Sequence, residues 1–573
     1  MDYNSVTKYR FQELRPGGDG RLTTEWQLTD TKLLDAVKLG LPPMHAIPII
    51  FVPGIMGSNL SDMDNKPVWL LNASIMDAPA VLAWNWMPKS AGKRQKILHP
   101  SRTKVYREGA VPKDNSVSEL RSADLIHRGW GEVSESSYGK FLIWLHVKMN
   151  THRDPLAWKD FSQAGTEERL DSNNRWREIL HPGVDMMMKG LPDSAESGQR
   201  VEKIKSDDLI SRSKSTYPIY AFGYNWLGAN EDSAILLKNR ISSIISENNR
   251  GPIKCSQVML ITHSMGGLVA RACSQLPGMS KKIVGVVHGV MPSTGAAVAY
   301  RRCKVGMWDE DPIAGMVIGS NGKEVTAVFS QSPGALQLLP SEEYGANWLK
   351  IMDESGKTIS SLPKIDPYDE IYLQRNRWWS LVTEDWLSPI GGTSIKWEEF
   401  QRNILCAKEF HRELAGKFHH NTFVFYGGGS EIKSFEKVIW RLFKGQVPEG
   451  GEKIPSADEV RNLTFKDIRT DGSNNLYVGG RSLLCTTTRS DASNAYARET
   501  SFWEIRCLKW NSVGDGTVPK VSGRAPRVAG GGSIHQQFEL PNIKHEAAFR
   551  DYDVAKTITY YAVTKLAALA DRA

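Results

Sequence analysis

The feature that most constrains the fold is an apolar strand that leads directly into a serine and two glycines. Residues 258–262 read VMLIT, an uninterrupted apolar run typical of a strand buried on both faces of a sheet. The next residues, HSMGGLVARACSQL, place four apolar side chains on one helical face: Leu268, Val269, Ala272 and Leu276. A sharp strand-to-helix turn is therefore expected at Ser264, and such a turn holds its hydroxyl out over the sheet edge.

The same alternation of strand and helix continues on both sides of this turn. Three further segments read as buried strands, namely 47–52, 217–226 and 283–290. Apolar residues from Ala234 onward have helical spacing. This order is typical of a mostly parallel sheet flanked by helices. We therefore expect an α/β-hydrolase fold with large inserted cap or lid segments, and further strands at 422–429 and 502–510.

The chain is longer than one compact domain usually is, so insertions are expected. It has 573 residues, of which 40% are hydrophobic and 24% charged, as in a globular protein. We divide the chain into an N-terminal extension 1–44, a first core segment with the oxyanion loop 45–64, an insertion or cap 65–215, core with the nucleophile elbow 216–299, a second insertion or cap 300–415, core 416–445, an insertion 446–500, and core with the catalytic Asp and His 501–573.

Ser264 needs a base to activate its hydroxyl and an acid to orient that base. In this fold the chain order is Ser, then Asp or Glu, then His. Asp515 lies between two glycines, just after the strand expected at 502–510, which suits an acid at the carboxyl edge of a sheet. The alternative is a tight Asp-Gly turn without a chemical role.

Two late histidines compete for the role of the base. His535 precedes QFEL and is expected to begin a strand, whereas His545 lies in a loop before the C-terminal helical region. A catalytic base belongs in such a loop, so we choose His545. His263 is a poorer choice because neighbouring side chains on a turn diverge, and His288 ends a buried strand, which favours a structural role.

An ester hydrolase also needs two backbone N–H groups to bind the developing oxyanion. One is expected from Met265, the residue after the nucleophile. The other is expected from Ile55, in the loop VPGIMGS after the first strand, where Gly54 and Gly57 free the backbone to turn. The alternative is a simple turn that leads from the strand into the insertion.

These motifs together resemble known lipid hydrolases. VPGIMGSNL, THSMGGLVAR and GDGTVP resemble segments of the lecithin–cholesterol acyltransferase-like hydrolases, and THSMGG also resembles the PGAP-like esterases. GVVHGVMPSTGAAVAYRR (285–302) and VTAVFSQSPGALQLLPSEEY (325–344) resemble lipase effectors of bacterial type VI secretion. The resemblance covers about half of the chain and is weakest for 60–215 and 446–500.

The resemblance implies a serine lipase or phospholipase that acts on membrane phospholipids, with Ser264, Asp515 and His545 as its triad. It also implies an antibacterial toxin with a cognate immunity protein and a secretion spike as partners, delivered to the periplasm of a target cell. The N-terminus has no apolar signal region, and the six cysteines are scattered without a C-x-x-C pair. Both features agree with a protein made in a reducing cytoplasm without a signal peptide.

Composition indicates which other ligands, such as nucleic acid, cofactors or metal ions, are to be expected. The net charge of +8 is mild for this length, and fits either a weak preference for anionic lipid headgroups or a solvated surface. The sequence shows no dense run of Lys and Arg with interleaved aromatic residues, so we do not expect nucleic acid as a partner. We expect no cofactor and no metal. The acidic pairs and runs at Asp62/Asp64 and 309–311 could hold a structural calcium ion, but a solvated surface is favoured.

Two alternatives to hydrolysis stay open, and a peptidase ranks below both. The same triad could serve an acyltransferase with an alcohol acceptor, or the fold could be a binding protein with an idle triad. Aromatic residues and methionines in the insertions could face lipid, although packing in a core is favoured. These residues are Trp84, Trp86, Trp378, Trp379, Trp386 and Met186–Met188.

Overall fold

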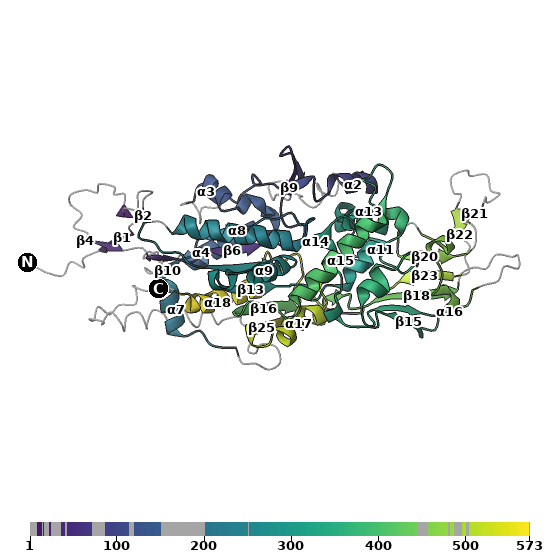
Figure 1. The fold of residues 1–573 in the computed structure, drawn as a ribbon. Helices are drawn as coiled ribbons and strands as arrows, with labels where there is room; N and C mark the ends of the chain where they lie inside the picture. The colour runs from purple at the N-terminus through teal and green to yellow at the C-terminus, as the bar shows by residue number, and fades with distance from the viewer. Residues whose placement is uncertain are drawn as a thin grey trace, which may run out of the picture.

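The structure is a computed structural model of the chain, and most of the residues are described by it. The described residues are 43–70, 86–113, 120–150, 201–249, 251–444, 455–470, 472–479 and 503–571, together with strand segments at 9–13, 15–16, 22–23, 36–40, 482–485 and 496–499. The molecule is elongated, with a parallel sheet and its helices in one half and a second sheet in the other (Figure 1).

The core is a six-stranded sheet in which every neighbouring pair of strands is parallel, in the order β11-β6-β12-β13-β16-β25. Its strands are β6 (Ile49–Val52), β11 (Ile219–Ala221), β12 (Val258–His263), β13 (Ile283–Gly289), β16 (Thr422–Gly427) and β25 (Ile534–Leu540). The first five coincide with the apolar runs that predicted them, although β12 is one residue longer than its run. The fold class predicted from the sequence, an α/β-hydrolase fold with a mostly parallel sheet, is confirmed. These strands were visible as apolar runs because a strand covered on both faces has no polar side.

Alternate residues of each core strand point into two different apolar layers. Phe51 of β6 packs with α4 (Glu135–Asn150) and α18 (Asp553–Leu569). Its neighbour Val52 packs with α8 (Asn230–Asn248) and α9 (Gly266–Gln275). Because all six strands run the same way, their carboxyl ends meet at one edge, and the loops that leave this edge lie close together.

A second six-stranded sheet has the order β15-β14-β18-β23-β20-β19. Its strands are β14 (Leu349–Met352), β15 (Thr358–Leu362), β18 (Val438–Lys444), β19 (Ile468–Arg469), β20 (Asn475–Val478) and β23 (Trp503–Cys507). The assignment of 416–445 and 501–573 wholly to the core is therefore wrong for β18 and β23, which pair with each other antiparallel. In both strands buried residues alternate with less buried ones, which is the pattern of a sheet covered on one face.

The helix α15 (Trp397–Leu414) contacts both halves of the molecule. Phe410 and Leu414 near its end belong to the apolar layer of the core sheet. Phe400 and Ile404 near its start belong to the apolar cluster of the second sheet. The predicted cap 300–415 is therefore joined to the core by a continuous helix with an apolar contact at each end.

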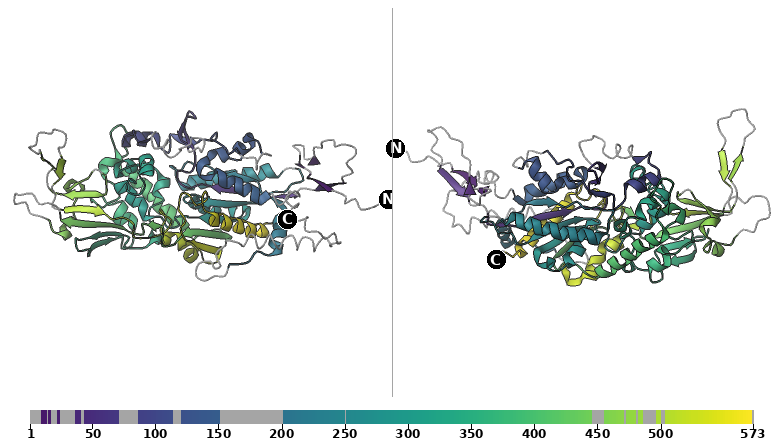
Figure 2. Two further views of the ribbon diagram at one scale, coloured as in Figure 1. Left: turned by 180° about the vertical axis from the view of Figure 1, so that it is seen from behind. Right: turned by 45° about the horizontal axis from the view of Figure 1, so that its top comes forward.

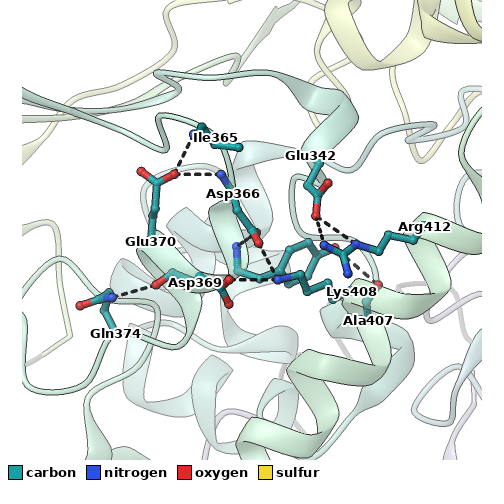
Figure 3. Close-up of polar contacts among 10 residues, drawn as sticks. Glu342, Ile365, Asp366, Asp369, Glu370, Gln374, Ala407, Lys408 and Arg412 are labelled. Carbon is teal, nitrogen blue, oxygen red and sulfur yellow. Dashed lines mark hydrogen bonds and ion pairs between the residues drawn. The ribbon is translucent and has the colours of Figure 1, made fainter.

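Ion pairs fix the exposed side of α15 to the segments beside it (Figure 3). Lys408 Nζ lies 2.5 Å from Asp366 Oδ2 and 3.1 Å from Asp369 Oδ2. One turn further along the helix, Arg412 Nη2 lies 3.0 Å from Glu342 Oε1. All these groups already have partners of opposite charge, so we assign this cluster a structural role.

The N-terminal extension 1–44 and the predicted cap 65–215 both contain regular elements. In the extension four short strands form two pairs: β1 (Tyr9–Glu13) with β4 (Ala36–Gly40), and β2 (Arg15–Pro16) with β3 (Leu22–Thr23). Within the predicted cap 65–215, α4 belongs to a layer of the core. Figure 2 shows the N-terminal strands and the hairpin of β21 (Ser482–Cys485) and β22 (Tyr496–Glu499) at opposite ends of the molecule. None of the helices in the described ranges combines the length and the apolar character needed to cross a bilayer.

Candidate active site

The turn between β12 and α9 has the strained backbone that the sequence predicts. Ser264 has φ = 51°, a left-handed conformation that a serine rarely adopts. A Cβ atom on Gly266 would lie 2.4 Å from the Pro53 carbonyl oxygen, so only glycine allows the helix to approach β6 this closely. Thr262, where a glycine is more usual, is buried and forms a 2.8 Å hydrogen bond with His288 Nδ1. The hydrogen bond accommodates the larger side chain.

Three side chains that are far apart in the sequence meet beside this turn. His545 Nε2 lies 2.8 Å from Ser264 Oγ, and His545 Nδ1 lies 2.8 Å from Asp515 Oδ2. Because a carboxylate can only accept, Nδ1 carries the imidazole proton and Nε2 is left as the acceptor for the serine hydroxyl. The arrangement therefore has the hydrogen-bonding order that proton transfer from Ser264 requires.

The loop of Asp515 holds its carboxylate in place from several sides. Asp515 Oδ1 accepts hydrogen bonds from the backbone N–H groups of Thr517 (2.9 Å) and Val518 (2.7 Å). The backbone N–H of His545 donates to the Asp515 carbonyl oxygen at 2.8 Å. Asp515 is 2% exposed. The carboxylate thus has one oxygen bound by the loop and the other free to orient the histidine.

The loop after β6 lies directly against the serine. A Cβ atom on Gly54 would lie 2.9 Å from Ser264 Cβ, so this glycine permits the close approach. The backbone N–H groups of Ile55 and Met265, the two predicted oxyanion donors, form no hydrogen bond with the residues that the structure describes. Met265 directly follows the serine and Ile55 directly follows Gly54, so both N–H groups are candidates to bind a ligand there.

A hydrogen-bonded chain behind the site escaped the sequence reasoning. The hydroxyl of Tyr138 on α4 lies 2.8 Å from His263 Nδ1, and His263 Nε2 lies 2.8 Å from the carbonyl oxygen of His545. A carbonyl only accepts, so Nε2 donates to it and Nδ1 accepts from the tyrosine. The Gly54 N–H donates to the same tyrosine hydroxyl at 3.4 Å. His263, which the sequence ranks low as a base, therefore supports the loop of His545.

Burial keeps this supporting histidine neutral. Its complete burial, and then the nearby His545, lower the pKa of His263 to about 3. Burial likewise raises the pKa of Tyr138 above its usual range. His263 and Tyr138 therefore act as fixed neutral partners. The sequence signal for His263 was its position next to the serine, but Tyr138 lies 125 residues away and gave none.

The acidic residues considered for calcium have other partners. Asp62 Oδ1 accepts from the backbone N–H groups of Asp64 and Lys66 in a tight turn, at 3.0 and 2.8 Å. Glu310 forms ion pairs of 2.8 Å with both Arg301 and Arg302. Within the described ranges, no group of three or more His, Cys, Asp or Glu residues is suited to hold a metal ion.

Four of the tryptophans considered for contact with lipid pack inside the protein. Trp86, Trp378, Trp379 and Trp386 are 9% exposed or less. Packing in a core, the alternative favoured from the sequence, is confirmed for these four. Trp84 and Met186–Met188 lie outside the described residues.

Comparisons with known proteins agree with this geometry. A family model described as a PGAP1-like alpha/beta domain matches residues 227–303, which include the serine turn. One solved structure that matches is the crystal structure of the Tle4–Tli4 complex, with 27% sequence identity and a TM-score of 0.67. The match covers 92% of this chain and 99% of that chain. The chain therefore has an α/β-hydrolase fold and resembles the Tle4 chain of that complex over nearly its whole length.

This finding confirms the predicted resemblance to the lipase effectors of type VI secretion. It extends the likeness to both sheets, because nearly the whole chain is covered. A structure of EstA from Clostridium botulinum also matches, with 13% identity, 66% of this chain and 85% of that chain covered, and a TM-score of 0.25, which is too low to carry an argument. No curated protein matches the sequence.

Proposed function

We propose that this Tle4-like hydrolase is a serine phospholipase and that Ser264, His545 and Asp515 are its catalytic triad. The observation that carries the proposal is the pair of 2.8 Å contacts from the His545 ring, one to Ser264 and one to Asp515. The strained backbone at Ser264 and the two available N–H groups beside it support the same assignment.

The mechanism follows from the directions of these hydrogen bonds. His545 Nε2 takes the proton from Ser264 as its Oγ attacks the ester carbonyl carbon, and the N–H groups of Ile55 and Met265 stabilise the oxyanion. The intermediate collapses with cleavage of the ester C–O bond, and His545 gives the proton to the leaving alcohol. A water molecule, deprotonated by His545, then attacks the acyl-enzyme and releases a fatty acid.

A small apolar pocket beside the oxyanion loop supports a substrate with apolar character. It lies between the oxyanion loop and the helices above it, and is lined by Met56, Trp69, Leu98, Val317 and Phe329 among others. Met56 directly follows the proposed donor Ile55, so the pocket begins beside the reacting carbonyl.

Product analysis tests the enzyme assignment. The purified protein is incubated with vesicles of phosphatidylethanolamine and phosphatidylglycerol, and the lipids are identified by mass spectrometry. We expect fatty acid and lysophospholipid from the wild type and from the control Ser280→Ala, which alters an exposed serine, but not from Ser264→Ala. Equal products from Ser264→Ala would contradict the triad, and a new ester formed only when glycerol or a sterol is added would favour an acyltransferase.

We further propose that the protein is an antibacterial toxin, delivered by a secretion spike to the periplasm of a target cell. The likeness to the Tle4 chain, which was crystallised with Tli4, supports a cognate immunity protein as a partner. Directing the wild type to the periplasm of a host should arrest its growth, and Ser264→Ala should not. Co-expression of the neighbouring gene should restore growth, and arrest by Ser264→Ala would show a toxicity independent of hydrolysis.

A further inference from the structure

The segment that covers the apolar pocket carries a concentrated positive charge. Residues 86–107 contain seven Lys and Arg residues and no Asp or Glu: Lys89, Lys93, Arg94, Lys96, Arg102, Lys104 and Arg107. The net charge of the whole chain is only +8, so one short stretch has almost as large an excess. Such a local excess produces a strong positive potential even where the overall charge is mild.

The helix α2 (Ala91–Ile97) has one face buried in the protein and another that carries exposed cations. Its buried face includes Arg94, which donates to the carbonyl oxygens of Val317 (2.6 Å) and Met316 (2.7 Å). Lys93 and Lys96 lie one turn apart and are exposed, as is Arg102. Within the described part of the chain these three cations form no ion pair. Arg94 and Arg107 of the same segment do have acidic neighbours, Glu324 at 3.8 Å and Glu132 at 3.5 Å, so the uncompensated charge is that of Lys93, Lys96 and Arg102.

Neighbouring groups show how closely the cations are gathered. Partial burial, and then the positive charges of Lys93 and Arg94, lower the pKa of Lys89. The Lys89 ammonium lies 4.8 Å from the centre of the Trp86 ring. An anion placed here would relieve the repulsion among these side chains.

Exposed apolar side chains stand beside the same cations. Met87, two residues before Lys89, is 50% exposed, and Ile390 is 97% exposed. The loop of Ile390 lies against α2, since a Cβ atom on Gly92 would lie 2.1 Å from the Ile390 carbonyl oxygen. We call Met87, Lys89, Lys93, Lys96, Arg102 and Ile390 the α2 patch. Apolar tips among basic residues suit the boundary between lipid headgroups and acyl chains.

The α2 patch is also close to the active site. Leu98, directly after α2, lines the apolar pocket together with Met56 and Trp69. Trp69 Nε1 donates to the carbonyl oxygen of Met56 at 2.8 Å. The same short segment thus presents its cations to the outside and forms a wall of the pocket that begins at the oxyanion loop. In Figure 1, α2 lies at the upper edge of the molecule, above α13 (Gly322–Phe329).

We infer that the α2 patch docks the protein on bilayers with anionic phospholipid headgroups, with Met87 and Ile390 inserted among the acyl chains. The inference rests on the proposed lipid substrate and adds the surface through which the bilayer is reached. Phosphate groups in the headgroups complement Lys93, Lys96 and Arg102, which have no acidic partner in the described protein. Docking in this way brings the pocket wall at Leu98 next to the lipid.

Vesicle binding tests the inference independently of catalysis. All proteins carry Ser264→Ala, so that no lipid is consumed. Binding to vesicles of pure phosphatidylcholine and of phosphatidylcholine with phosphatidylglycerol is measured by co-sedimentation. One basic residue contributes about fivefold to the affinity for an anionic surface, so Lys93→Glu/Lys96→Glu should weaken binding to the anionic vesicles by at least about 25-fold. Added salt should weaken binding of the parent protein.

The matched control carries the same change in charge at the edge of the core sheet opposite to the active-site loops. Lys281 and Lys417 are exposed and lie just before β13 and β16, at the amino ends of these strands. Lys281→Glu/Lys417→Glu should bind the anionic vesicles like the parent. Hydrolysis of a soluble short-chain ester by proteins that retain Ser264 should be equal in both double variants, which shows an intact fold.

Three results would overturn the inference. The first is equal binding of both double variants to the anionic vesicles. The second is a lack of preference for these vesicles over pure phosphatidylcholine. The third is binding of a nucleic-acid duplex, and not of vesicles, through Lys93 and Lys96. Failure of the proposed hydrolysis would leave all three readouts unchanged, because they are measured without catalysis.

Discussion

Replacement of Asp515 by Asn tests how the histidine is oriented. The amide that replaces the carboxylate has nearly the same shape, and its oxygen can keep the hydrogen bonds from the N–H groups of Thr517 and Val518. Its NH2 group then faces His545 Nδ1, where Oδ2 was 2.8 Å away. Because this group donates, Nδ1 has to accept, and the imidazole proton moves to Nε2. A protonated Nε2 has no lone pair to receive the proton of Ser264.

The size of the effect follows from this reversed tautomer. The equivalent change in a serine protease of unrelated fold lowers kcat by about 10⁴-fold. A loss of that size corresponds to about 5.4 kcal/mol of transition-state stabilisation. We expect a similar loss for Asp515→Asn, with little change in stability because the backbone contacts of the loop are kept.

The assay compares kcat for a soluble short-chain ester and for phospholipid vesicles. Asp385→Asn is the matched control, since it removes one negative charge from an exposed position. Unfolding by denaturant is measured on all three proteins. A kcat for Asp515→Asn within about tenfold of the wild type, with an unchanged unfolding midpoint, would refute the role given to Asp515.

Three further predictions concern the surroundings of the site. Gly266→Ala should lower turnover and should lower the free energy of unfolding by about 1–3 kcal/mol, because its methyl group would lie 2.4 Å from a backbone oxygen. A wild-type free energy in denaturant unfolding would contradict this prediction. Tyr138→Phe leaves His263 Nδ1 as a buried acceptor without a partner. We therefore expect a loss of about 1–3 kcal/mol in unfolding free energy together with a lower kcat. An unchanged kcat would show that the hydrogen bonds from Tyr138 through His263 do not position His545. The free energy of unfolding should fall as the pH drops below about 6.5, by about 1.4 kcal/mol per pH unit for each buried neutral histidine. The reason is that the unfolded chain takes up protons that the folded chain does not. A flat profile of denaturant midpoints from pH 7 to 5 would contradict this prediction. The histidines concerned have pKa values of about 3 (His263 and His288) or about 4 (His411 and His419).

The parallel core could be predicted because its signals are local. Strands buried on both faces need continuous apolar runs, as at 258–262, and a strained turn needs small neighbours such as Gly266. The order of Ser264, Asp515 and His545 added a long-range rule to these local signals. The structure brings the three side chains together within hydrogen-bonding distance, as the prediction required.

The second sheet could not be predicted in the same way. The strands at 438–444 and 503–507 have alternating burial and pair across about 60 residues, so neither segment identifies its partner. Asp515 was expected to follow a core strand at 502–510, but β23, the strand found there, belongs to the second sheet. The hydrogen bond between Tyr138 and His263 likewise depends on tertiary packing, because α4 was assigned to a cap.

Labelling with a lipid-like fluorophosphonate tests the central claim most directly. The reagent reacts only with a serine that a nearby base activates, and the modified residue is located by mass spectrometry of the digested protein. We predict one adduct, on the peptide that contains Ser264, lost in Ser264→Ala and formed far more slowly in Asp515→Asn. An adduct on a different residue, or no adduct on a folded protein that still hydrolyses phospholipid, would contradict the account.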